Sequence, residues 1–515
     1  MKHKKIFLFN TVILTATALL LRGIGLFFRV YLSNIVGAEG MGLYQLIFSV
    51  YMLASTFATS GISTAVTRLC ADEMVCGNKK TVFRVLTRSV QLSVIVGALI
   101  NMAVYVFSNT IADIFIGDMR AAPSLRILSF SLVPMGISAC FKGYFMARRK
   151  TITPSIASML EQFVRIAVII SFFSALSAKD IETACFYVLL ADTVAETISC
   201  IFICLSGKLD KKKLTTAEGD GSITGSVAAA ILKIATPITA GRYLTSGLHT
   251  AENLIVPKCL SAFSGDQTSG LETFGLLKGM ALPIIFFPSS FLQAISTLLI
   301  PEISESAALG AKETIRRDVE RVIGITIIGS VLVGGWFFLC SDSIGIALYE
   351  SPESGVLINV LAPLVPVMYL ESVVDGILKG LNKQNSTLLY NTIDSGIRIA
   401  LILLLVPSLG MDGFLLIMIF SNLLTCSLNF IKLLKVTILK FDINNWFFKP
   451  LIAIVIAVVF ARQICMNIQN HIAYIIISIS IISAVYFAII LITGAIDFER
   501  CKAISKRRIK CRNNT

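Results

Sequence analysis

Long apolar segments follow one another along the whole chain and are separated by short polar loops. A helix needs about 20 apolar residues to cross a bilayer, whereas a barrel strand needs about half as many, so these segments are predicted to be helices. Breaks at charged, Gly, Pro and polar clusters give fourteen expected spans: 6–36, 41–70, 82–107, 123–147, 153–177, 182–206, 228–256, 272–301, 322–341, 356–381, 386–407, 412–435, 447–465 and 472–496.

The composition agrees with an all-α polytopic membrane protein. Of 515 residues, 55% are hydrophobic and 15% are charged, against about 25% charged in soluble proteins. The net charge of +14 comes from short basic loops and the chain ends, with no interleaved aromatic residues. It therefore indicates orientation by the positive-inside rule rather than nucleic-acid binding, and it predicts that both termini are cytoplasmic.

An internal repeat divides the chain. "GLYQLIFSVYMLASTFATSGIST" begins at Gly42 and "GLLKGMALPIIFFPSSFLQAIST" begins at Gly275, which is 233 residues later. The triplet Arg-Ile-Ala begins at Arg165 and again at Arg398, with the same offset of 233. Each repeat contains six expected spans, so the two copies have the same orientation in the membrane.

The repeat predicts two parallel, pseudo-symmetric six-helix lobes. Transporter substrate sites lie at such repeat interfaces near the membrane midplane. The expected organisation is a first lobe over 1–206, a cytoplasmic linker over 207–227, a second lobe over 228–440, and two further helices with a basic cytoplasmic tail over 441–515.

Several arginines interrupt the apolar spans. Arg22 and Arg29 lie seven residues apart in the first span and share a helix face, and Gly23 and Gly25 between them permit a bend. A charge at mid-membrane costs about 2.5–3.5 kcal/mol on insertion scales, so its presence indicates either function or snorkelling to the interface. Arg68 and Arg242 are the corresponding candidates in the second and seventh spans.

Because Arg binds phosphate oxygens bidentately, these four arginines predict a cavity for an anionic head group. Other intramembrane charges are candidates for ion coupling or for neutralising a neighbouring charge. Arg165 follows Glu161 by four residues, and Arg398 follows Asp394 by four. The coupling or counter-ion candidates are Asp394, Glu252, Asp192, Glu196, Arg165 and Arg398.

No enzyme signature accompanies these residues. The chain has no Walker A loop, no metal-spaced His, Cys and carboxylate cluster and no nucleophile elbow, and its twelve Cys are scattered as expected of reduced thiols. A non-enzymatic protein without a cofactor is expected, with Na⁺ or H⁺ as a coupling cation. An ion channel is the weaker reading, since no filter-like loop appears.

Three blocks carry a family resemblance. They are "IVGAEGMGLYQLIFSVYMLASTFATSGISTAVTRL", "FKGYFMARRKTITPSIASMLEQFVRIAVI" and "FGLLKGMALPIIFFPSSFLQAISTLLIPEISES". Over about residues 5–440 the sequence resembles the SpoVB-type (stage V sporulation protein B) polysaccharide transporters. That group belongs to the MOP superfamily with the MurJ lipid II flippases, Wzx flippases and MATE exporters.

The resemblance implies a two-lobed, alternating-access protein of about fourteen helices in a bacterial cytoplasmic membrane. By position, Arg22, Arg29, Arg242 and Arg68 are similar to the cavity residues of MurJ. The sequence departs from MurJ at the acidic residue that follows the first MurJ helix, where it offers only Glu39, at a loop position in "GAEGMG". Asp394 matches the MurJ sodium site by helix number alone.

The leading hypothesis is a flippase for an undecaprenyl-pyrophosphate-linked oligosaccharide, specifically lipid II for spore cortex. It would work with membrane lipids and the peptidoglycan synthesis machinery. The alternatives are export of another lipid-linked polysaccharide unit, a MATE-like antiporter of small cations, and a non-transporting scaffold. A cation exporter is expected to carry acids where this chain has Arg22, Arg29 and Arg242.

Overall fold

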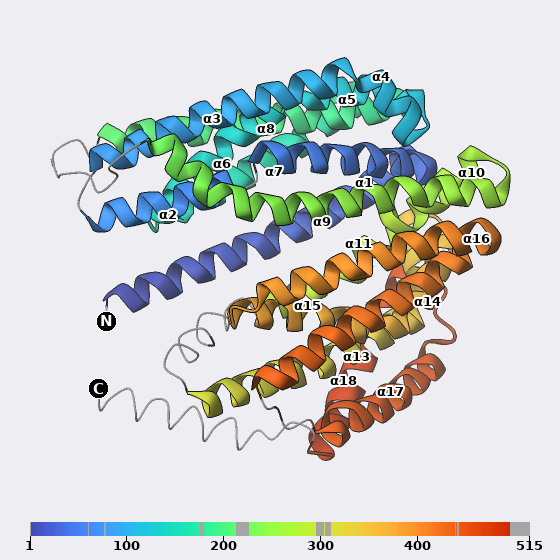
Figure 1. Ribbon diagram of the computed structural model, residues 1–515. Helices are drawn as coiled ribbons and strands as arrows, with labels where there is room; N and C mark the ends of the chain where they lie inside the picture. The colour runs from blue at the N-terminus through green and yellow to red at the C-terminus, as the bar shows by residue number, and fades with distance from the viewer. Residues whose placement is uncertain are drawn as a thin grey trace. The chain divides into compact units, whose positions relative to one another are not determined.

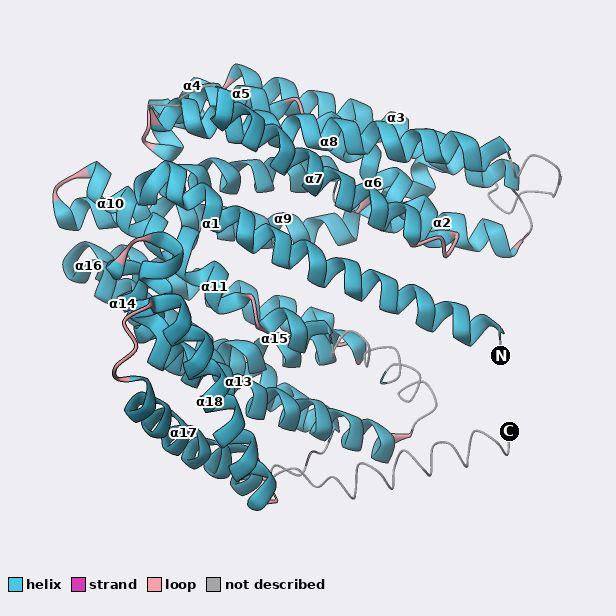
Figure 2. Ribbon diagram, turned by 180° about the vertical axis from the view of Figure 1, so that it is seen from behind, coloured by secondary structure: helices cyan, strands magenta, loops and turns pink. Residues whose placement is uncertain are grey.

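The computed structural model describes residues 2–59, 61–76, 79–175, 180–212, 226–294, 303, 311–437, 439 and 442–494. Every regular element within these ranges is a helix (Figure 2). The middle of the expected linker (213–225), the end of the eighth expected span (295–301) and the basic tail (495–515) lie outside the described residues.

The first helix, α1 (Lys2–Thr59), is longer than one membrane crossing and turns at a glycine. Its backbone leaves helical geometry at Gly37, where φ is 69°. A positive φ is accessible to glycine without a Cβ clash, so the turn falls there. The permitted bend at Gly23 and Gly25 is not used, because the backbone stays helical through both. After Gly61 (φ 75°), α2 continues over Ile62–Val75.

The chain forms two compact units, and the first comprises Met1–Pro283 and Leu388–Ser421. In this unit α9 runs beside α1 and α2 (Figure 1). Its further elements are α3 (Lys79–Val106), α4 (Ser108–Thr110), η1 (Ile111–Ile116), η2 (Met119–Ala121), α5 (Ala122–Ser129), α6 (Leu132–Ala147), α7 (Ile152–Ala175), α8 (Ile181–Lys212), α9 (Val227–Ser264), α10 (Gln267–Phe274) and η3 (Gly275–Ala281).

The second unit comprises Ile284–Thr387 and Asn422–Thr515. Its core gathers around α13, and Tyr486 donates its hydroxyl to the carbonyl of Ile328 at 2.9 Å. Helices α17 and α18 pack on α13. The elements are α13 (Lys312–Tyr349), α14 (Pro352–Leu361), η4 (Ala362–Leu364), α15 (Val365–Gly380), η5 (Asn444–Phe448), α17 (Lys449–Cys465) and α18 (His471–Ile492).

Two helices belong to both units. These are α11 (Leu282–Phe286) and α16 (Gln384–Thr437), and α16 leaves helical geometry at Gly410. The units differ from the lobes expected from the repeat, because α9, α10, η3 and part of α16 belong to the first unit. The lobe limits stay a prediction.

Ten helices in the described part are long and apolar enough to cross a membrane, or up to eleven if the bent pair α5 and α6 forms one span. Two of the ten stretches have 63 and 54 residues and contain the breaks at Gly37 and Gly410. Large apolar side chains also lie exposed, such as Phe27 at 76% and Ile492 at 85%. The chain is therefore a multi-pass membrane protein.

Candidate functional site

The two copies of the repeat touch at equivalent positions inside the first unit. A Cβ on Gly275 of η3 would overlap the carbonyl oxygen of Ala38, and a Cβ on Gly42 of α1 would overlap that of Leu271. Glycine thus permits the two backbones to lie against each other. One turn later, Gln45 Nε2 donates to the carbonyl of its own counterpart, Lys278, at 3.5 Å, across a separation of 233 residues.

An ion cluster joins α7 to α8 in the first unit. Arg165 pairs through Nε with Asp192, its Nη2 lies 3.2 Å from Glu161, and its Nη1 donates to Gln162 at 2.9 Å. Lys142 of α6 lies 3.9 Å from the other Glu161 oxygen. The Arg165 side chain is 24% exposed and that of Asp192 is 9% exposed, so the pair is largely removed from solvent. We call these residues, with Glu196 one turn after Asp192 on α8, the first cluster.

A second cluster forms on α9, η3 and α16. Arg398 Nη2 pairs with Asp394, and its Nη1 donates to the two oxygens of Glu252 at 3.3 and 3.4 Å. Lys278 Nζ lies 3.6 Å from Glu252, whose side chain is 2% exposed. Ser421 donates its hydroxyl to Asp394 at 2.6 Å. These five residues are the second cluster, and His249 lies 4.0 Å from Glu252 at its edge.

The two clusters are built on the same repeated pair. Glu161 and Arg165 stand 233 residues before Asp394 and Arg398, so the acid-to-arginine spacing of four residues recurs. The remaining partners differ, since Asp192 lies on α8 and Glu252 lies on α9. All six coupling or counter-ion candidates from the sequence therefore lie in these two clusters, in contact with oppositely charged neighbours or, for Glu196, beside them.

The four candidate cavity arginines have different surroundings. In the described part of the chain, Arg29 on α1, Arg68 on α2 and Arg242 on α9 have neither a hydrogen bond nor an ion pair. Arg68 and Arg242 are exposed and Arg29 is half-buried, and Arg22 is exposed on α1. The Arg29 guanidinium acts electrostatically on the buried Tyr44 hydroxyl, and Asp192 of the first cluster acts electrostatically on the same hydroxyl.

The helices that carry Arg68 and Arg242 are held together closely. Near the end of α1, just before α2, the carbonyl of Phe57 accepts from Tyr243 of α9 at 3.3 Å, and the two rings lie 4.2 Å apart. A Cβ on Gly61, at the start of α2, would overlap Thr239 of α9. Packing thus fixes the backbones of α2 and α9, while the guanidinium groups of Arg68 and Arg242 keep no partner in the described residues.

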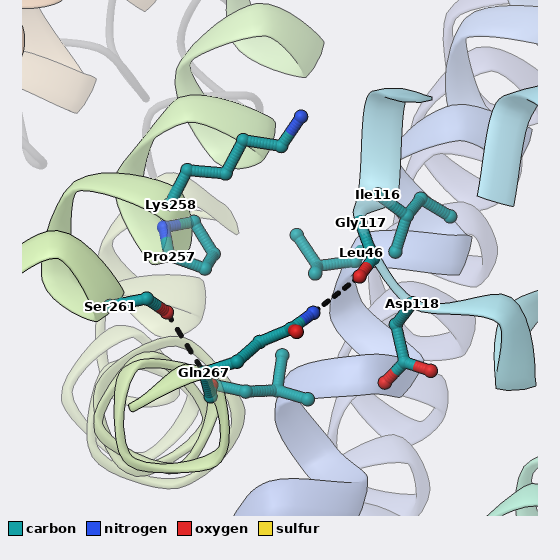
Figure 3. Close-up of a pocket in the computed structure, with 9 residues that line it drawn as sticks. Leu46, Ile116, Gly117, Asp118, Pro257, Lys258, Ser261 and Gln267 are labelled. Carbon is teal, nitrogen blue, oxygen red and sulfur yellow. Dashed lines mark hydrogen bonds between the residues drawn. The ribbon is translucent and has the colours of Figure 1, made fainter. Parts of the chain in front are cut away.

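A hollow of about 300 Å³ lies between the turn joining η1 to η2 and the ends of α9 and α10 (Figure 3). Figure 3 shows the Gln267 amide reaching across it to the carbonyl of Gly117. Lys258 donates to the carbonyl of Ile114 at 2.6 Å, so its charge is already engaged. The lining consists of Leu46, Ile116, Gly117, Asp118, Pro257, Lys258, Ser261, Gln267 and Leu271. None of the four candidate arginines lines it.

On the same turn, Arg120 pairs with Asp118 and with Glu39, each at 2.7 Å. The Arg120 guanidinium donates hydrogen bonds to both carboxylates, so its charge is compensated on two sides. Glu39 is thus bound to Arg120, although the family resemblance aligned it with the acidic residue that follows the first MurJ helix.

Sequence reasoning did not single out every member of the clusters. Lys142 stands in "FKGYFMARRK", where it reads as one of several bases at a span end, and Gln162 and Ser421 give no signal within their apolar segments. Lys142 reaches Glu161 because α6 packs on α7. Gln162 lies three residues before Arg165 on α7 itself, so its role follows from helix geometry.

Comparison with known proteins gives the family. Residues 7–306, more than half of the chain, match the family model described as "Polysaccharide biosynthesis protein". The chain belongs to this family. This family member is 23% identical over 450 residues to "Stage V sporulation protein B" of Bacillus subtilis (strain 168), which covers 86% of both chains.

Solved structures establish the fold of this family member. The lipid II flippase MurJ in an inward closed conformation superposes with a TM-score of 0.71 at 14% identity and covers 93% of this chain and 98% of that chain. A multidrug resistance MATE transporter in its inward-facing conformation superposes with a TM-score of 0.64 at 12% identity, over 81% and 97% of the two chains. The MurJ- and MATE-like fold expected from the sequence is confirmed.

Proposed function

We propose that this chain is a transporter, not an enzyme, and that it moves a lipid-linked oligosaccharide across a bacterial cytoplasmic membrane. One observation carries the proposal: Arg29, Arg68 and Arg242 have no carboxylate partner among the described residues. Uncompensated charge is costly in a membrane protein, so it is retained where function needs it. An anionic ligand is the partner that these arginines are suited to bind.

A pyrophosphate head group fits this set of arginines. Each guanidinium presents donors in a fixed fork that matches phosphate oxygens, and Arg forms bidentate pairs with them. The family is described by polysaccharide biosynthesis, and one relative is named for sporulation. An undecaprenyl-pyrophosphate-linked sugar, specifically lipid II for spore cortex, is the substrate that agrees with both the arginines and the family description. Arg22, on the same helix as Arg29, is a further candidate from its position in the sequence alone.

The proposed mechanism is alternating access by two lobes, 1–206 and 228–440, joined by the linker 207–227 and followed by 441–515. About fourteen helices would cross the membrane, with both termini cytoplasmic. The contact of Gly42 and Gly275 supports the symmetric arrangement, because equivalent residues of two copies meet where they lie on the axis that relates them. An ion gradient or the membrane potential would drive the cycle, and the peptidoglycan synthesis machinery would use the product.

A flipping assay in proteoliposomes tests this function. Fluorescent lipid II is expected to exchange between leaflets in vesicles that contain the purified protein. Arg242→Ala and Arg29→Ala are expected to slow the exchange by about 10–100-fold, since a hydrogen bond to a charged group contributes about 1.5–3 kcal/mol. Arg317→Ala, an equal loss of charge at a 58% exposed side chain, is the matched control and should leave the rate unchanged.

The result also separates the alternatives. Exchange of a different pyrophosphate-linked sugar at the same rate would assign export of another polysaccharide unit. Exchange of a cationic dye with no exchange of any lipid-linked sugar would contradict the proposal and favour a MATE-like antiporter. A scaffold would show neither activity, and its Arg242→Ala variant would function normally in cells.

A further inference from the structure

The first cluster contains more acid than base. Its three carboxylates are Glu161, Asp192 and Glu196, and its two cations are Lys142 and Arg165. The second cluster is balanced, since Glu252 and Asp394 face Lys278 and Arg398. The repeated pair is the same in both, so the difference arises from the residues added around it.

Glu196 is the carboxylate that the first cluster leaves over. It is 7% exposed, and its Oε1 has no hydrogen-bond partner in the described part of the protein. Arg165 is bound by Asp192 and Glu161, and Lys142 lies against Glu161 at 3.9 Å. The hydroxyl of Ser138, on α6, is buried beside Glu196.

Polar and titratable groups face Glu196 from α8 itself and from helices that pack against α8. On α5, Arg126 is bound to Ser108 and Asn109 and belongs to a different site. The facing groups are Tyr51 of α1, Ser138 and Lys142 of α6, Glu161 and Arg165 of α7, and Asp192 and Cys200 of α8 itself.

An ionised carboxylate in this position is unfavourable. Burial removes its hydration, and an uncompensated buried charge costs several kcal/mol unless the group is neutralised. Binding a proton removes the charge, and the new O–H then has Ser138 beside it as an acceptor. We propose that Glu196 is a proton-binding site and that its proton is the coupling ion of the transport cycle.

The cluster also offers a route for the proton. Glu161 and Lys142, at the side of the cluster formed by α6 and α7, are 20% and 32% exposed, whereas Glu196 is nearly enclosed. A rearrangement of α6 or α7 that brings Lys142 or water to Glu196 would favour the ionised form and release the proton. The residue 233 positions after Glu196 is Asn429, which is 0% exposed and permanently neutral, so the second copy has no equivalent carboxyl group there.

This inference names the coupling ion of the proposed transport and rests on that function, but its first measurement needs no substrate. Infrared difference spectra of the purified full-length protein in nanodiscs, recorded during a pH titration, report the C=O stretch of protonated carboxyl groups. Exposed carboxyl groups are ionised above about pH 6, so in that range we expect one band that disappears as the pH rises further and that is absent from Glu196→Gln. Glu182→Gln, at an exposed position in the first turn of the same helix, is the matched control and should keep the band.

A band that titrates above about pH 6 and persists in Glu196→Gln, or no such band in the unmodified protein, would overturn the assignment. If Glu196→Gln does not fold, Glu196→Asp retains an ionisable group, and the band is expected to shift in frequency and apparent pKa. A melting temperature that rises with Na⁺, but not with falling pH, and loses this response in Glu196→Gln would instead assign a sodium site and contradict the proposal.

Proteoliposomes then connect the site to transport. A pH gradient is expected to accelerate lipid exchange by the unmodified protein and to leave Glu196→Gln unaffected, while Glu182→Gln responds normally. Equal acceleration of Glu196→Gln would contradict coupling at this site. Absence of lipid exchange together with a normal infrared band would refute the proposed substrate but not the proton site.

Discussion

Two groups of arginine occur in the first unit, and they have opposite surroundings. Arg165 and Arg398 are each held by two carboxylates and are about one-fifth to one-quarter exposed. Arg29, Arg68 and Arg242 have no such partner among the described residues. The chain therefore supplies carboxylates where an arginine joins two helices. For the arginines without a carboxylate, the negative charge would come from a ligand.

The comparison of the two groups of arginine shows that a charge within a membrane span does not by itself identify a binding residue. A charge that is neutralised by its own protein connects helices, and its removal leaves the partner acids buried and unpaired. A charge without such a partner can be removed without that penalty and is available to a ligand. The following variants test this division, from the largest expected loss of stability to the smallest.

Arg398→Ala should destabilise the protein most. Glu252, at 2% exposed, and Asp394, at 4%, would both lose their guanidinium partner. Breaking a buried pair from one side costs about 3–5 kcal/mol, so the melting temperature and the yield in mild detergent should both fall sharply. Arg242→Ala is the matched control. Equal stability of the two variants would remove the distinction between the two groups of arginine.

Gly275→Ala should have the next largest effect, because the new Cβ would overlap the Ala38 carbonyl and displace η3, which carries Lys278 of the second cluster. Overpacking of this kind costs about 1–3 kcal/mol. No atom lies within 4 Å of the position that a Cβ on Gly396 would occupy, so Gly396→Ala adds a methyl group without a clash and is the control. Thermal unfolding should place only Gly275→Ala below the unmodified protein, and an unchanged melting temperature would show that the close approach is not needed.

Arg29→Ala and Arg242→Ala should leave stability within about 0.5 kcal/mol, as substitutions away from buried networks usually do. Transport should nevertheless slow by about 10–100-fold, and Lys at either position should restore it only in part, since Lys supplies charge without the planar fork. Abundance on membranes and flipping rate, measured on the same preparations, test both halves. Loss of abundance in parallel with rate would mean that these arginines are structural.

Glu39→Gln is expected to have the smallest effect. The Glu39 side chain is 24% exposed and that of Arg120 is 36% exposed, and Arg120 would keep Asp118. A partly exposed ion pair of this kind contributes about 0.2–1 kcal/mol. A small decrease in melting temperature that is reduced by added salt would agree with this, whereas a loss as large as that of Arg398→Ala would not.

The helices could be predicted from the sequence because runs of apolar residues determine them, and the expected segments coincide with helices wherever the chain is described. The position of a turn was harder to predict. Gly23, Gly25 and Gly37 look alike in the sequence, but only Gly37 takes a positive φ. That choice depends on which segments pack side by side, and apolar periodicity does not specify it.

The candidate charges could also be found in the sequence, but not their partners. The spacing of Arg165 from Glu161 showed one ion pair, because it lies within a single helix. Its pair with Asp192 depends on the packing of α7 against α8, and that of Arg398 with Glu252 on the packing of α16 against α9. For the same reason, the sequence indicated Asp394 as a partner of Arg398 but gave no sign of Glu252.

Binding of a pyrophosphate lipid tests the central claim most directly. Affinity for lipid II and for undecaprenyl phosphate, which lacks the second phosphate and the sugars, is measured on purified protein in nanodiscs, for the unmodified chain and for Arg29→Ala, Arg242→Ala and Arg317→Ala. The account predicts tighter binding of lipid II, weakened about tenfold or more by each of the first two variants and unchanged by the third. Equal affinity for lipid II in all four proteins would contradict it.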